Sequence, residues 1–109
     1  MNAVKNKKIP DTVYNRVIAL CRDYDRMKKE LSALRMVEDY DAEPKMRRIK
    51  FDISAVDAGL TSVCEEYREG VKDNLIHGKR CIDIPYASES TWKRYRREAI
   101  IKIAEAYGL

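Results

Sequence analysis

Two runs of apolar residues dominate this sequence, and in each run the residues recur at alternating spacings of four and three. Such spacing places them on one stripe of an α-helix, because three or four residues make about one helical turn. The first run comprises Val13, Val17, Leu20, Tyr24, Met27, Leu31 and Leu34, and the second comprises Ile49, Ile53, Val56, Leu60, Val63 and Tyr67. The pattern predicts helices over residues 11–37 and 45–61 that pack as a helical hairpin. The alternative is a coiled-coil seam between two copies of the chain.

An acidic stretch separates the two runs. Glu38, Asp39, Asp41 and Glu43 precede Pro44, so the helical pattern is lost and a turn is expected. Carboxylates can bind a hard cation, but the regular ligand spacing and central glycine of a calcium loop are missing. We therefore expect a solvated acidic turn.

Further breaks divide the second half of the chain. Gly59 and the sequence SVCE that starts at Ser62 predict a break, because Ser62 can cap a new helix while Glu65 reaches back to it. This helix should end at Gly78, since glycine readily adopts the left-handed conformation found at helix ends. Its inward residues would be Tyr67, Val71 and Leu75. The proline-containing stretch that follows favours a loop over a short strand.

The last helix carries apolar and basic residues on different sides. Ser88 or Ser90 can cap its start, and at about 100° per residue its apolar side chains share one broad face. That face holds Trp92, Tyr95, Ala99, Ile100, Ile103, Ala106 and Tyr107. The other side of its first two turns holds Lys93, Arg94 and Arg97. Arg96 projects within the apolar arc, which indicates an edge position or a contact outside the fold. The basic residues are typical either of a solvated surface or of a helix presented to phosphate.

The net charge permits an anionic partner without requiring one. Lys and Arg total 22 against 18 Asp and Glu, which gives a net charge of +4 at neutral pH. Lys5, Lys7 and Lys8 make residues 1–9 a basic arm without apolar periodicity, and we expect it to be flexible. The length fits one small helical domain over residues 1–109.

The cysteines and the histidine do not suggest metal or redox chemistry. Cys21, Cys64 and Cys81 are widely spaced and form no CxxC pair, so reduced thiols are expected, with Cys81 the most exposed. His77 has no evident partner at the spacing of a ligand set or triad, so a helix end or exposure is expected. No leader, membrane-spanning run or glycine-rich phosphate loop is recognisable. We expect a cytoplasmic protein of a bacterial host cell with no cofactor, no metal and no catalytic residues.

The last part of the chain carries a resemblance to a known family. It contains Ser90-Thr91 before a basic and aromatic helix, the run WKRYR, and an Ile103-Ala104 pair. With these residues the chain resembles the small phage and prophage transcription regulators of the RinA and ArpU type. The resemblance implies a C-terminal DNA-binding segment, residues 62–109, that is similar to region four of sigma factors. It implies a recognition helix from Ser90, with DNA contacts from Ser90, Thr91, Lys93, Arg94, Arg96 and Arg97.

One feature departs from the family pattern. A helix-turn-helix needs a supporting helix joined to the recognition helix by about three or four residues. The stretch from Gly78 to Ser88 is too short for such a helix and contains Pro85. A degenerate helix-turn-helix is therefore expected. Trp92 and Tyr95 are more typical of core than of base-stacking residues, because they share the apolar face.

Together these patterns predict an all-α fold in which a helical hairpin precedes C-terminal helices, the last a recognition helix. The favoured function is a phage-type transcriptional regulator, without catalysis, that binds double-stranded DNA. Host RNA polymerase or another protein is a further partner, a homodimer is left open, and no membrane is involved. The alternative is a non-catalytic protein interaction module or inhibitor from a phage or mobile element, which would use the hairpin or the acidic turn.

Overall fold

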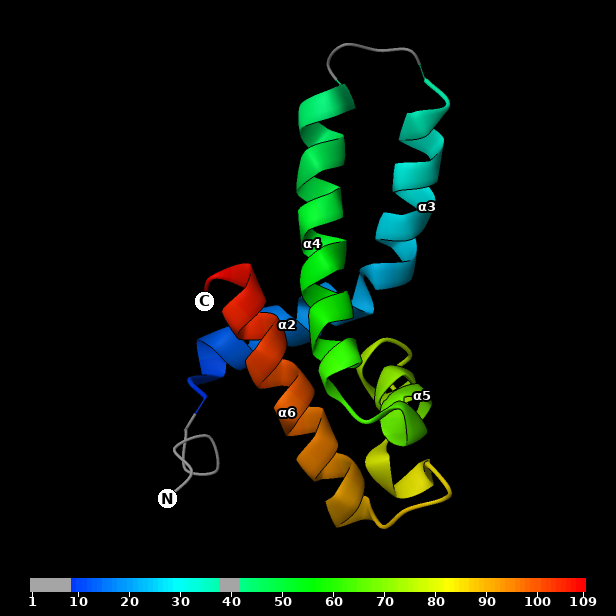
Figure 1. Ribbon diagram of the computed structural model, residues 1–109, viewed down its shortest axis with the longest axis vertical. Helices are drawn as coiled ribbons and strands as arrows, with labels where there is room; N and C mark the ends of the chain where they lie inside the picture. The colour runs from blue at the N-terminus through cyan, green and yellow to red at the C-terminus, as the bar shows by residue number, and fades with distance from the viewer. Residues whose placement is uncertain (1–8, 38–41) are drawn as a thin grey trace.

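A computed structural model describes residues 9–37 and 42–109, and the regular secondary structure in these ranges consists of helices (Figure 1). The described elements are α2 (Asp11–Arg22), α3 (Tyr24–Arg35), α4 (Ala42–Ser62), α5 (Glu65–Leu75), the 3-10 helix η1 (Cys81–Asp83) and α6 (Glu89–Tyr107). No strand occurs in these two ranges, so the predicted all-α class is confirmed. The basic arm up to Lys8 and the acidic residues Glu38, Asp39 and Asp41 lie outside the described residues.

The first predicted helix consists of two helices. The spacing predicts a single helix over residues 11–37, but α2 ends at Arg22 and α3 begins at Tyr24, with Asp23 in a turn between them. Figure 1 shows α2 running across the molecule and α3 running along its long axis. The reason is packing: α2 contacts α4, α5 and α6, whereas α3 packs on α4. The Asp23 carboxylate accepts two hydrogen bonds from Arg26, which stabilises the start of α3.

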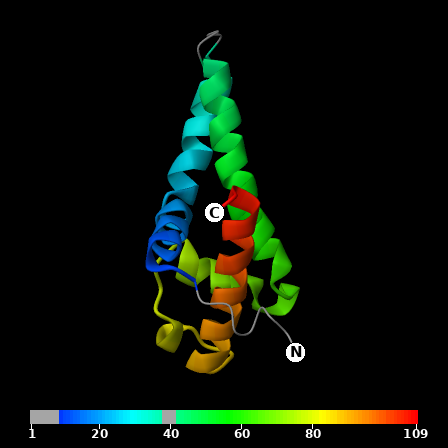
Figure 2. The ribbon, with the colours of Figure 1, turned by 90° about the vertical axis from the view of Figure 1, so that its left-hand side faces the viewer.

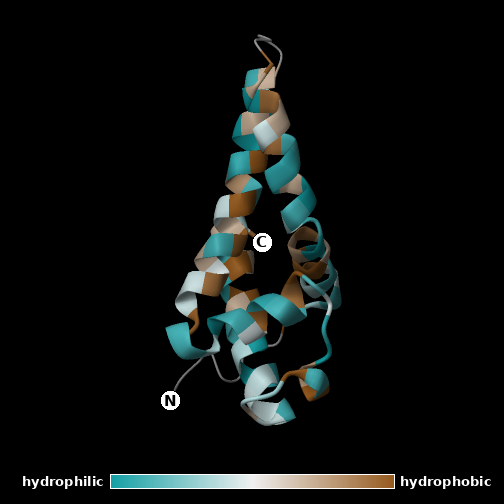
Figure 3. Cartoon of the chain, turned by 90° about the vertical axis from the view of Figure 1, so that its right-hand side faces the viewer, coloured by the Kyte–Doolittle hydropathy of each residue, from teal (hydrophilic) through white to brown (hydrophobic). Residues whose placement is uncertain are grey.

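The helices α3 and α4 form the predicted hairpin, which projects from the rest of the molecule as an arm (Figures 1 and 2). Its helix α4 begins at Ala42 rather than at residue 45, with Pro44 in the first turn, where a missing N–H costs no hydrogen bond. Hydrophilic and hydrophobic residues mix along every helix in Figure 3. Within the described ranges, none of the helices has the length and apolar character needed to cross a membrane.

The break between α4 and α5 lies near its predicted place, but the predicted capping box does not form. Ser62 ends α4, and its hydroxyl donates to the carbonyl of Gly59 at 2.7 Å. Arg68 of α5 instead donates to three carbonyl groups at the end of α4, at 3.0, 3.2 and 3.1 Å. A guanidinium group therefore satisfies the carbonyls that the end of a helix leaves unpaired.

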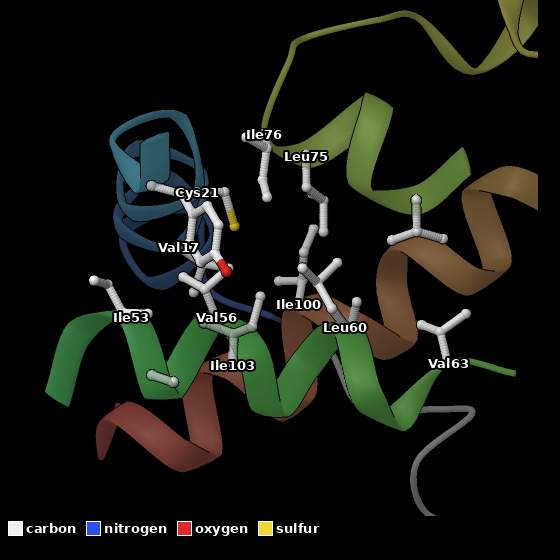
Figure 4. Close-up of a cluster of buried hydrophobic side chains, with 14 of the residues drawn as sticks. Val17, Cys21, Ile53, Val56, Leu60, Val63, Leu75, Ile76, Ile100 and Ile103 are labelled. Atoms are coloured by element: carbon white, nitrogen blue, oxygen red, sulfur yellow. The ribbon is translucent and has the colours of Figure 1, made fainter. Parts of the chain in front are cut away.

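The five helices α2 to α6 bring apolar side chains into one core, part of which is drawn in Figure 4. The side chains that point toward one another there include Val17, Cys21, Ile53, Val56, Leu60, Leu75, Ile100 and Ile103. Of the first apolar stripe, Val17, Tyr24 and Leu31 are 0%, 5% and 8% exposed within a single chain. These residues therefore belong to the core of the single chain, as the hairpin interpretation predicts.

Two glycines bring α6 close to its neighbours. A Cβ atom at Gly59 of α4 would collide with Ile103 and would lie 2.7 Å from the carbonyl oxygen of Ala99. A Cβ atom at Gly70 of α5 would collide with the ring of Trp92. Glycine inside a helix normally costs stability, so the close contact explains its use at both positions. The helix α6 is thus held from two sides.

The connection from α5 to α6 is a loop that contains η1, as the sequence predicts in preference to a strand. Gly78 has a φ of 75°, and its N–H donates to the carbonyl of Asn74 at 3.1 Å, which confirms its role near the helix end. The hydroxyl of Ser88 accepts the N–H of Thr91 at 3.2 Å. This bond confirms Ser88 as the cap of α6.

Candidate nucleic-acid interface

The helix α6 is anchored along one side. Its buried residues are Trp92, Ala99, Ile100, Ile101, Ile103 and Ala104. Ala106, predicted on the apolar face, is exposed, and Ile101 joins that face instead. The indole N–H of Trp92 donates to the carbonyl of Ile84 at 3.1 Å, which ties the first turns of α6 to the preceding loop. Figure 1 shows that α6 begins at the end of the molecule opposite the α3–α4 arm.

Four exposed residues of the first turns of α6 form what we call the basic face. They are Ser90, Lys93, Arg94 and Arg97. Lys93 lies 2.9 Å from Glu89 in an exposed ion pair, and this carboxylate raises the pKa of Lys93. The guanidinium of Arg94 lies over the ring of Tyr95, 4.9 Å from its centre. The basic face combines exposed cations with a hydroxyl at the start of a fixed helix.

Two of the predicted DNA-contacting residues lie off the basic face. Thr91 is half-buried, and both its N–H and its hydroxyl contact the hydroxyl of Ser88. Arg96 is half-buried, with its guanidinium over the ring of Tyr14 at 5.2 Å. The position of Arg96 confirms the predicted edge of the apolar arc. Thr91 belongs to the helix cap, and Arg96 belongs to the contact between α6 and α2.

A basic groove of about 520 Å³ lies between α6, the end of α2 and the loop after α5. Its polar lining comprises Arg22, Asn74, Lys79, Arg80, Glu89, Lys93 and Arg96. Arg80 forms an ion pair with Asp83 at 2.8 Å, so part of this charge is compensated. Arg22, Lys79 and Arg80 are not among the residues predicted from the sequence. The sequence offered a signal for Lys79 and Arg80, because they directly follow the helix-ending Gly78. Arg22 comes to the groove only through the fold.

Aromatic residues cluster beside the start of α6. The rings of Tyr67 and Tyr95 stack at 4.5 Å, and Trp92 meets Tyr67 edge-on at 5.6 Å. Trp92 is buried, which confirms its predicted core role. Tyr86, which is 71% exposed and has a φ of 87°, was not predicted from the sequence. A bulky residue with positive φ is strained, so Tyr86 is held there by its surroundings, which include Tyr67 at 5.7 Å.

The arrangement before α6 differs from a helix-turn-helix of ordinary spacing. Residues 76–88 separate α5 from α6, whereas that motif joins its helices by about three or four residues. The three-residue η1 lies in this connection and packs against α6. The degenerate helix-turn-helix therefore stays a prediction.

The other titratable residues were only partly predicted. His77 is exposed, as expected, but its ring lies 3.3 Å from Asp25 and 3.4 Å from Asp73. The position of Asp73, four residues before His77, was the signal missed. Cys64 is the exposed thiol, and Cys81 is buried, so the expectation that Cys81 is the most exposed was wrong. In the described part of the chain, no group of three His, Cys, Asp or Glu residues could hold a metal ion.

The basic face and the basic groove are thus the features from which a function can be argued. The resemblance to phage regulators adds a hypothesis to this geometry. Comparisons of the chain with protein-family models, with curated proteins and with solved structures found no match, so that resemblance stays a prediction.

Proposed function

We propose that the protein binds double-stranded DNA through the basic face of α6 and acts as a phage-type transcription regulator without catalysis. One observation carries the proposal: the first turns of α6 expose basic side chains on one side, while the same helix is anchored by buried side chains, most of them in its second half. Recognition helices use this arrangement, because their first turns approach base edges while Arg and Lys hold phosphates. The helix dipole adds to the attraction of phosphate at the same end.

The contacts already present on the basic face leave it available to DNA. The ion pair between Lys93 and Glu89 is exposed, and exposed ion pairs are weak, so phosphate can replace Glu89. Ser90 is exposed in the first turn, where a hydroxyl can contact either base edges or phosphate.

The test compares two triple variants that remove the same charge. The first removes the cations of the basic face: Lys93→Ala, Arg94→Ala and Arg97→Ala. The matched control removes three exposed cations of α4: Arg47→Ala, Arg48→Ala and Lys50→Ala. Duplex affinity would be measured by fluorescence anisotropy over a series of salt concentrations, with circular dichroism to check the fold.

The first variant should lose affinity at low salt, and its slope of log K against log salt should flatten by about 0.9 for each lost phosphate contact. The control should bind as the parent does. Both variants should melt normally, because surface substitutions usually change stability by no more than about 0.5 kcal/mol. If the two variants lose the same duplex affinity, the loss comes from net charge and not from the basic face. The proposal would be refuted if the parent protein does not bind duplexes at low salt.

Sequence preference would be measured by selecting bound duplexes from a random pool at two salt concentrations. If Arg94 or Arg97 contacts a base, its replacement should relax the sequence preference at one base pair of the binding site. The discrimination lost at that base pair should be about 1–3 kcal/mol. A residue that contacts only phosphate should weaken binding to all sequences equally.

A second candidate function is protein binding by the α3–α4 arm. Directly after α3 come Met36 and Val37, which are 87% and 55% exposed. Apolar residues at a projecting tip suit a protein partner such as host RNA polymerase. Binding of purified polymerase should then be lost with Met36→Gln and Val37→Thr, while duplex affinity is kept. Unchanged polymerase binding in this double variant would remove the arm from consideration.

A further inference from the structure

The basic groove contains three cations without a carboxylate partner among the described residues: Arg22, Lys79 and Arg96. They come from α2, from the loop after α5 and from α6. Arg22 donates through Nε to the carbonyl of Leu75 at 3.1 Å, and this bond fixes the guanidinium beside the groove. Arg22 and Arg96 come from different helices and both line the groove. Cations that line one groove repel one another, and an anion bound among them would offset this repulsion.

A buried amide completes this arrangement. Asn74 lines the groove and is only 8% exposed. Its Nδ2 donates to the carbonyl of Lys79 at 2.8 Å, which fixes the orientation of the amide. Its Oδ1 is buried and has no hydrogen-bond partner among the described residues, and the same holds for Nε of Arg96. Buried polar atoms are nearly always paired, so Oδ1 of Asn74 calls for a hydrogen-bond donor and Nε of Arg96 calls for an acceptor.

We propose that the basic groove binds a phosphomonoester, with its phosphate between Arg22, Lys79 and Arg96 and with Asn74 accepting a hydrogen bond from it. Phosphate suits this set because its charged oxygens accept from guanidinium and ammonium groups. At neutral pH a phosphate group still carries a proton part of the time, and this O–H can donate to Oδ1 of Asn74. Sulfate has the same shape but no proton to donate. A nucleotide could supply the donor from its sugar hydroxyls as well.

This site is distinct from the duplex interface. The basic face is the exposed outer side of α6, whereas the phosphomonoester would lie on the inner side, between α6 and the loop after α5. Lys93 is the residue common to both, so the test leaves Lys93 unchanged. The phosphomonoester could come from a free nucleotide or from the 5′ end of a DNA strand.

The test titrates the full chain by isothermal calorimetry with inorganic phosphate, adenosine 5′-monophosphate and sulfate. Short duplexes with and without a 5′-phosphate would be added to separate the two sources. The variants are Lys79→Gln, Arg96→Gln and Asn74→Leu, with Arg47→Gln as the matched control on α4. Lys79 is exposed, and its hydrogen bonds to Asp73 and Asn74 are made by its backbone N–H and carbonyl, so Lys79→Gln should fold normally even if Asn74→Leu does not.

We expect the phosphate ligands to bind more tightly than sulfate, and each charge variant to lower their affinity about tenfold while the control has no effect. Asn74→Leu should remove the preference for phosphate over sulfate. Binding of the phosphorylated duplex alone would support the site and identify a DNA end as its source. Equal affinity for sulfate and phosphate, or no binding of any phosphate ligand, would overturn the inference. Duplexes without a 5′-phosphate report on the basic face, so failure of either proposal can be recognised separately.

Discussion

Replacing Gly70 by alanine should destabilise the protein, although alanine is the better helix former. Gly70 lies in the middle of α5, and a Cβ atom there would overlap two ring atoms of Trp92 and approach Cζ2 to 2.9 Å. Carbon atoms in good contact are about 3.5–4.0 Å apart, so the ring or the helix must move. The ring cannot turn away freely, because its N–H donates a hydrogen bond to the carbonyl of Ile84 and the ring packs edge-to-face with Tyr67.

The expected magnitude follows from two opposing terms. Glycine to alanine inside a helix gains about 1 kcal/mol in helix propensity. Forcing an extra methyl group into a packed core costs about 1–3 kcal/mol, and the fixed ring of Trp92 places this case near the upper value. We therefore expect a net loss of about 2 kcal/mol in the free energy of unfolding, or roughly 10 °C in Tm for a chain of this size.

Urea unfolding followed by far-UV circular dichroism would measure this loss. Fluorescence of Trp92, the only tryptophan, reports on the same contact. Trp92→Phe removes the atoms that meet the new methyl group, and alone it should cost about 2 kcal/mol through a cavity and a lost hydrogen bond. Combined with Gly70→Ala, it should cost clearly less than the sum, because the methyl fills that cavity. A gain of about 1 kcal/mol for Gly70→Ala alone would refute the close-packing explanation.

Three further outcomes follow from the buried groups. Cys64 should react with a thiol reagent in the native protein, whereas Cys21 and Cys81 should react only on unfolding. Burial raises the pKa of Cys21 from 9.0 to about 12, so stability should be complete below pH 9.0 and fall as the pH rises toward 12. At about pH 10.5 this group alone should cost about 2 kcal/mol, and Cys21→Ala should flatten the pH dependence measured by urea unfolding. Tyr24→Phe removes the 2.6 Å bond to Asp57 and should lower the free energy of unfolding by about 1.5 kcal/mol in the same assay.

The features that could be predicted from the sequence depend only on residues that are close together along the chain. The spacing of the apolar stripes predicted the helices and most of the core, because a residue's face on a helix depends only on its position along it. Ser88 was one of two predicted caps, and Gly78 was predicted near a helix end, because these roles are decided within one turn. The exposed cations of α6 were found in the same way, since they fall opposite an apolar face.

The features that could not be predicted depend on distant parts of the chain. The turn at Asp23 has no proline or glycine, and it follows from the different packing partners of α2 and α3. The capping box at Ser62 did not form because Ser62 is still the last residue of α4, where its hydroxyl donates to Gly59, and α5 begins only at Glu65. The basic groove joins Arg22 to Lys79, which are far apart in sequence and meet only in the folded chain.

Two contributions to DNA binding can be separated by experiment: the fixed position of the basic face and the attraction between its charges and DNA. Gly70→Ala leaves every cation in place but disturbs the packing of Trp92, which holds the first turns of α6. The triple replacement of the basic face removes charge but leaves this packing intact. If fixed geometry matters, Gly70→Ala at a temperature where it is still folded should weaken sequence-specific binding more than non-specific binding, because only base contacts need exact placement. Loss of charge should instead weaken both and flatten the salt dependence. Competition with random duplexes would measure the sequence preference. If Gly70→Ala leaves this preference unchanged, the packing of α6 against α5 has no part in recognition.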